Sequence, residues 1–144
     1  MEHSPRFFQS IQRNLLAIIS LLLALASLSY NTWRNESTEQ NRNQRAAGFA
    51  VLHELAALQL LTDHITYGEE RGHGDTIAGW TRVIFISDLA HLTSPALEAK
   101  AKALEREWTE QVGALPDSAK ANKAVSAHIK AAREQAMKSI EALK

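Results

Sequence analysis

Residues 15–33, LLAIISLLLALASLSYNTW, decide how this chain is organised. The stretch contains no charged side chain. As an α-helix it would be about 28 Å long, and the hydrocarbon core of a bilayer is roughly 30 Å thick. Length and composition therefore predict a single transmembrane helix over residues 15–33, preceded by a short tail over residues 1–14.

The residues at the two ends of this stretch are typical of a membrane interface. Arg13 and Arg34 bracket it, and long cationic side chains at such positions extend to the lipid headgroups. Tyr30 and Trp33 lie one helical turn apart and suit the aromatic belt of a membrane protein. We therefore expect these four residues at the membrane surfaces.

Two alternatives compete with a permanent anchor. Arg6, Arg13 and the leucine run also fit the first two regions of a secretory signal peptide, with Ala24-Leu25-Ala26 as its cleavage pattern. Cleavage after Ala26 would release a secreted helical protein. The other alternative is the buried core helix of a soluble protein.

The positive-inside rule gives little information on orientation, because two arginines precede the stretch and three follow within a dozen residues. Moving a short tail with two arginines across a membrane is the less common route. We therefore expect a single-pass signal-anchor in a plasma membrane, the inner membrane of a bacterium, with the folded domain on the extracytoplasmic side.

Composition limits what the rest of the chain can be. The 144 residues suit one small domain beside the anchor. Sixteen basic and sixteen acidic residues balance, which gives no general attraction to nucleic acid. The chain has no cysteine, so disulfides, thiolate metal sites and cysteine nucleophiles are excluded. Few glycines and prolines favour an all-α protein.

A polar stalk over residues 34–45 follows the membrane stretch. It contains no apolar residue. Ser37 and Gln40 fit a capping box that would restart a helix after a break at Asn35 or Glu36. A continuous helix is the alternative. Beyond it, residues 46–144 are predicted to form a small antiparallel bundle of three to four helices, because short connections favour antiparallel neighbours.

The first helix of this domain, residues 46–67, has two apolar faces. One face carries, at steps of three and four, Val51, Leu55, Leu58, Thr62 and Ile65. The opposite face carries Phe49, His53, Leu60 and His64. A helix contacted from two sides is typical of the central helix of a bundle or of a helix used in oligomerisation. On the second interpretation, this second face is the candidate interaction surface.

Three further helices are predicted. Residues 68–75, with three glycines, form a loop, and residues 76–92 form a buried helix with apolar residues all round. Ser94-Pro95 begins the next helix, which ends near Gly113 and Pro116. Asp117 or Ser118 caps a last helix whose stripe is rich in alanine. Residues 35–75 have seven acidic and three basic side chains. The basic surface of the last helix therefore suggests an antiparallel pairing with the first helix of the domain.

No pattern indicates an enzyme. The sequence has no phosphate-binding glycine loop, no nucleophile elbow and no H-E-x-x-H motif, so we predict no catalytic residue and no cofactor. Glu70 with His73, and Asp88 with His91, have the three-residue spacing of di-iron proteins. The bridging glutamates cannot be placed, so no metal site is predicted.

The sequence therefore predicts a membrane-anchored, non-enzymatic helical protein that works by protein–protein interaction, either as a homo-oligomer or with another protein. In plan it resembles the sensor modules of bacterial receptors, which also have a second membrane helix and a signalling domain that this sequence lacks. A ligand-binding sensory or carrier domain, with a pocket near Trp80 and Trp108, is one alternative. The secreted protein is the other.

Overall fold

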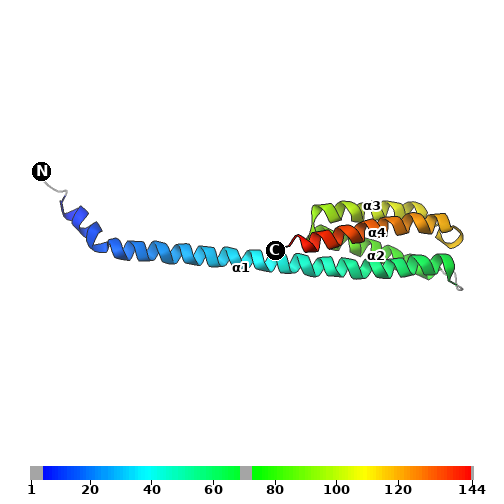
Figure 1. Cartoon of the computed structure of the whole chain (residues 1–144), viewed down its shortest axis with the longest axis horizontal. Coiled ribbons are helices and arrows are strands. Elements are labelled where there is room, and N and C mark those ends of the chain that lie inside the picture. The colour runs from blue at the N-terminus through cyan, green and yellow to red at the C-terminus, as the bar shows by residue number, and fades with distance from the viewer. Residues whose placement is uncertain (1–4, 69–72, 144) are drawn as a thin grey trace. The chain divides into compact units, whose positions relative to one another are not determined.

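The computed structural model describes residues 5–68 and 73–143, with side chains for residues 14–68 and 76–143. The described chain is all-helical, which confirms the all-α part of the predicted fold. It contains α1 (Pro5–Tyr67), α2 (His73–Thr93), α3 (Pro95–Gln111), a 3-10 turn η1 (Leu115–Asp117) and α4 (Ala119–Glu141) (Figure 1). Two compact units, Met1–Gln40 and Asn41–Lys144, are described separately below.

The first unit contains the apolar stretch. Within it, α1 is long and apolar enough to cross a membrane, by length and composition, and none of the residues in that apolar window is buried. The large side chains between Leu15 and Leu28 are 42–80% exposed. A lone helix offers them no partner, so their apolar surface needs another environment.

The polar residues 34–45 are helical throughout. Of the two alternatives for this segment, the structure therefore has the continuous helix, without a break at Asn35 or Glu36. Thr38 Oγ1 donates to the carbonyl of Arg34 at 2.8 Å, a bond within one helical turn.

The second unit is built on one hydrophobic core to which all four α-helices contribute. The face of α1 expected to be buried is buried, because its residues recur at the helical period and point the same way. These residues are Val51, Leu55, Leu58, Thr62 and Ile65.

Helix directions follow from side-chain contacts. Arg82 of α2 binds Glu54 of α1, and a Cβ on Gly79 would lie 3.1 Å from Leu61, so α2 runs antiparallel to α1. Ser87 and His91 of α2 bind Glu105 and Glu98 of α3 in the same reversed order.

Helix α4 completes the unit beside α3 and α1. Near the start of α4, Asn122 donates a hydrogen bond to Thr66 at the end of α1. Just beyond the end of α4, the carbonyl of Leu143 accepts one from Arg45 Nη2, earlier on α1, at 2.8 Å. Helix α4 therefore runs antiparallel to α1. Figure 1 shows these four segments side by side within this unit.

The expected burial of α2 is wrong, although its helical structure is right. Val83, Ile86 and Ala90 face the core. Four large apolar residues are instead 47–72% exposed: Ile77, Ile84, Phe85 and Leu92. In a unit of four helices, each helix buries one side, so a helix that is apolar all round leaves apolar surface open.

The two capped starts are as predicted. Ser94 Oγ accepts from Leu97 N at 3.2 Å, with Pro95 in the first turn of α3. Ser118 Oγ accepts from Ala121 N at 3.1 Å and caps α4, which decides between Asp117 and Ser118. These bonds satisfy amide groups that a helix start leaves without partners.

Helices approach each other closely at two glycines. A Cβ on Gly79 of α2 would overlap Cζ2 and Cη2 of Trp108, which is fully buried on α3. A Cβ on Gly48 of α1 would come within 2.7 Å of Cγ1 of Ile140 on α4. These contacts need a residue without a side chain, so the glycines fix the helix spacing.

Replacing Gly79 with alanine should lower the free energy of unfolding by about 1–3 kcal/mol, because the indole must move in a packed core. Chemical denaturation of the full-length protein in detergent, followed by circular dichroism, measures this. The control is Gly113→Ala: no atom lies within 4 Å of a Cβ there, and we expect unchanged or slightly raised stability. Equal effects in the two variants would refute the close contact.

Candidate functional site

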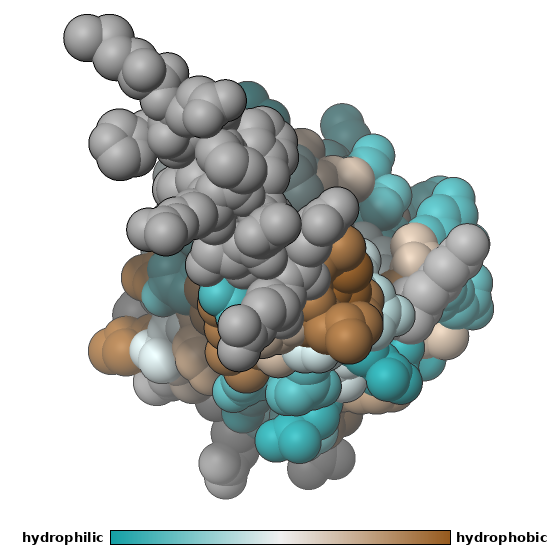
Figure 2. All heavy atoms as spheres, turned by 90° about the vertical axis from the view of Figure 1, so that its left-hand side faces the viewer, coloured by the Kyte–Doolittle hydropathy of each residue, from teal (hydrophilic) through white to brown (hydrophobic). Residues whose placement is uncertain are grey.

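The exposed large apolar residues of unit Asn41–Lys144 gather on two helices. Seven of them form what we call the α1/α2 surface: Phe49, Leu60, Tyr67, Ile77, Ile84, Phe85 and Leu92. The only other one in the described part of this unit is Met137 on α4. Figure 2 views the molecule from the side of Figure 1 on which α1 begins, with hydrophobic residues in brown and hydrophilic ones in teal. Large exposed apolar areas mark sites of interaction.

Lysine has the opposite distribution. Every lysine of the chain lies at or beyond residue 100, and all six described ones are exposed on α3 and α4. Lysine is depleted in protein interfaces and enriched on surfaces that stay in water. Helices α3 and α4 thus have the composition of a solvated face, and α1 and α2 that of a contact face.

A hollow of about 340 Å³, which we call the α1 hollow, lies at Leu60 of the α1/α2 surface. Four of its lining residues are one side of α1: Ala57, Leu60, Leu61 and His64. Arg82 of α2 lines it as well. Its guanidinium binds Glu54 at 2.6 Å. The hollow is therefore mostly apolar, with its one strong cation already paired.

The four residues predicted as an interaction face all come from α1. Phe49 is 56% exposed and Leu60 is 73% exposed. The His53 side chain is also open, with Nδ1 3.4 Å from a Glu54 carboxylate oxygen. His64 is exposed and lines the hollow beside Leu60. That they bind a partner remains a prediction.

The two tryptophans proposed for a pocket occupy different environments. Trp108 is fully buried and packs over Gly79, and its Nε1 donates no hydrogen bond within the described residues. Trp80 is partly buried against the same core. Neither residue lines the hollow on α1 or a second, charged one on α3 around Lys102, Glu105 and Arg106.

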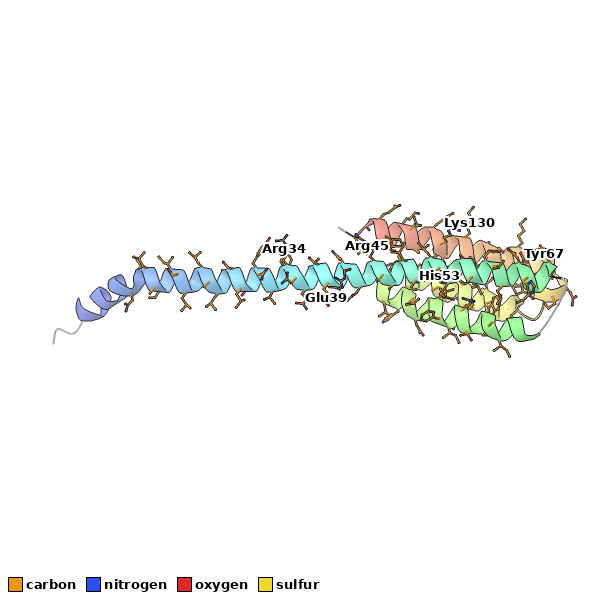
Figure 3. The ribbon with its side chains drawn as sticks, turned by 90° about the horizontal axis from the view of Figure 1, so that it is seen from below. Arg34, Glu39, Arg45, His53, Tyr67 and Lys130 are labelled. Atoms are coloured by element: carbon orange, nitrogen blue, oxygen red, sulfur yellow. The ribbon has the colours of Figure 1, made fainter. Side chains whose placement is uncertain are left out.

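The four residues proposed for the membrane interface belong to the first unit. Tyr30 and Trp33 are 62% and 64% exposed. Their rings lie 6.2 Å apart in a tilted arrangement. Arg34, labelled in Figure 3, is exposed as well. The Arg13 side chain lies outside the described side chains.

The described residues contain no group of three His, Asp or Glu side chains that could hold a metal ion. Of the two spacings considered for di-iron, Glu70 with His73 lies outside the described side chains. His91 does not join Asp88 in a site: its Nδ1 is 3.1 Å from Glu98. A hydrogen bond from Lys102 and another from His91 lower the pKa of the Glu98 carboxyl.

A polar network between α1 and α4 was not predicted from the sequence. Asn122, which is 6% exposed, donates from Nδ2 to Asp63 at 3.0 Å and to the Thr62 carbonyl at 3.2 Å. Gln59 Nε2 donates to Ser126 Oγ at 2.9 Å and to Asp63 at 3.0 Å. Helix α4 therefore pairs with α1, as expected, but through neutral donors to Asp63 and apolar packing. Among the described residues, no cation of α4 forms an ion pair with an acid of α1.

The only trace of this network in the sequence is the position of its residues at the edges of two apolar stripes. Asn122 follows Ala121 in the predicted stripe of α4, one position off its centre. Its partner Asp63 stands beside Thr62, on the edge of the buried face of α1. Polar residues at the edge of an apolar stripe are common, so sequence spacing alone does not reveal which of them meet.

Replacing Asn122 with alanine should destabilise the protein by about 1–3 kcal/mol, because Asp63 and the Thr62 carbonyl lose a donor at a buried position. Thermal unfolding of the full-length protein reports it. Lys123→Ala, at the neighbouring exposed position, should change stability by less than about 0.5 kcal/mol. A neutral Asn122→Ala variant would contradict the role assigned to the network.

Comparison with known protein families, curated proteins and solved structures finds no match to this chain.

Proposed function

We propose that this protein is held in a membrane by residues 15–33 and acts, without catalysis, by binding another protein through its α1/α2 surface. The observation that carries the proposal is the separation of residue types: exposed apolar side chains gather on α1 and α2, and exposed lysines on α3 and α4. On a surface that contacts only water, exposed apolar side chains and lysines are expected to be mixed rather than separated.

Membrane anchoring is supported by the exposure of the apolar stretch. Burying its large side chains in lipid is favourable by roughly 1.5–3 kcal/mol for each leucine or isoleucine. Tyr30, Trp33 and Arg34 then stand at one end of the stretch, where interfacial residues belong. The folded residues 46–144 form an antiparallel helical bundle in this proposal, on the extracytoplasmic side.

The anchor can be tested by placing charge in the apolar stretch. The double substitution Leu22→Arg, Leu25→Arg should make membrane insertion less favourable by about 3 kcal/mol at each position, near the centre of a bilayer. The full-length protein should then leave the membrane fraction. The control adds the same two charges in the polar segment, at Ser37 and Gln40, and should stay in the membrane.

Band mass and protease access in the same experiment separate the alternatives. A C-terminal tag that protease removes from cells stripped of their outer layer places the domain outside. A protected tag on full-length protein places it in the cytoplasm. A soluble band shortened by 26 residues would refute the anchor and establish the secreted protein.

The contact surface can be tested at its most exposed leucine. Leu60→Asp should weaken association by about 2 kcal/mol, roughly thirtyfold in Kd, because a charge replaces apolar contact area. Sedimentation or native mass spectrometry of the detergent-solubilised protein measures it. Leu60 is 73% exposed, so the fold itself, followed as helical content by circular dichroism, should stay unchanged.

The matched control is Met137→Asp, which changes an exposed apolar residue of α4 outside the α1/α2 surface. It should leave association unchanged. If Leu60→Asp and Met137→Asp behave alike, the α1/α2 surface is not the contact face.

A further inference from the structure

We propose that the α1 hollow receives Leu60 of a second copy of this chain, in a parallel, in-register pair of α1 helices. This inference rests on the proposed function and names the partner of the α1 part of the α1/α2 surface. Three features support it: the height of the hollow along α1, the spacing of the residues around it, and the charges beside it.

Along the axis of α1, the centre of the hollow lies at the height of Leu60. Its four α1 residues lie at positions −3, 0, +1 and +4 relative to Leu60. Four residues in this arrangement form the hole that receives one side chain, the knob, from a facing helix. The centre of the hole falls between residues 60 and 61, within about 1 Å of Leu60 along the axis. A copy in register therefore brings its own Leu60 to the hole.

The residues above and below continue this seam. Steps of three and four, the spacing of a two-helix contact, connect Ala50, His53, Ala57, Leu60, His64 and Tyr67. In the structure the last three and His53 are exposed, and the two alanines are partly exposed. Ala57 is next to Leu60 in the seam, and a small residue at this position lets two backbones approach closely.

The charges beside the seam do not oppose a second copy. Glu54 is paired with Arg82 of its own copy at 2.6 Å. Asp63 accepts hydrogen bonds from Gln59 and Asn122 on the side toward α4. The flanking residues next to Leu60, namely Ala56 on one copy and Leu61 on the other, are both apolar. Self-association of the seam therefore sets no like charges against each other beside Leu60.

The membrane decides between the two directions. An antiparallel pair centred on residue 60 would also bring Leu60 to the hole. Two copies anchored by their N-terminal stretches in one membrane start from the same side, so their α1 helices run parallel. A lipid surface is a poorer occupant, because interfacial helices are rich in Lys and Arg, whereas α2 has Arg82 alone among its described side chains, already paired.

Cysteine cross-linking of the full-length protein in its native membrane tests this directly, because the chain has no cysteine of its own. A disulfide requires Cα atoms within about 7 Å. On mild oxidation, His53→Cys should yield a covalent dimer, since residue 53 of one copy faces residue 53 of the other. Lys130→Cys, on exposed α4, is the matched control and should yield none (Figure 3).

Adding Leu60→Asp to the His53→Cys variant should reduce the dimer band at least tenfold, and adding Met137→Asp should leave it unchanged. A mixture of separate His53→Cys and Tyr67→Cys proteins that cross-links only between the two variants would show an antiparallel pair and overturn the proposed direction. Equal dimer bands for the His53→Cys and Lys130→Cys variants would show random collision and also overturn the proposal.

The failure of this inference differs from the failure of the proposed function. If His53→Cys gives no dimer while Leu60→Asp still removes the protein from a larger native complex, the partner is another protein and only the second copy is refuted. If neither substitution changes any association, both proposals fail.

Discussion

The arrangement of residues 41–144 depends on close contact between helices at positions without bulky side chains. Trp108 lies over Gly79, and Ile140 lies against Gly48. The stripe of α4 adds Ala121, Ala132 and Ala136, all buried. Small residues shorten the distance between helix axes, which lets one large indole fill the space between them. The same choice limits the apolar area that α4 can bury.

The polar network compensates for this on the α1 side of α4. Alanine stripes slide easily, since neighbouring positions along the helix are nearly equivalent in shape. Asn122 and Ser126, one turn apart, bind Asp63 and Gln59, also one turn apart. Buried hydrogen-bonding groups lose their partners if α4 shifts by a residue, and each loss is costly. We infer that packing brings α4 to α1 and that these bonds set its register.

Sequence periodicity predicted the helices and the buried face of α1, because both depend on local spacing. The Ser94-Pro95 start was predictable for the same reason: its capping bond spans three residues. Periodicity did not predict the burial of α2. Every side of α2 is apolar, so the pattern does not show which side packs against a neighbouring helix. The contacts of Trp108 with Gly79 and of Asn122 with Asp63 join distant segments, so no local signal identifies them.

The composition of the α1 seam limits how strong a contact between two copies can be. Alanines and histidines surround Leu60, so a contact through this seam buries little apolar area and includes polar layers. Polar layers in a helix pair select register at a cost in stability. Such a contact is weaker than one made by leucines alone. On the proposed anchoring, both copies are confined to one membrane, which raises their effective concentration and makes a weak contact sufficient.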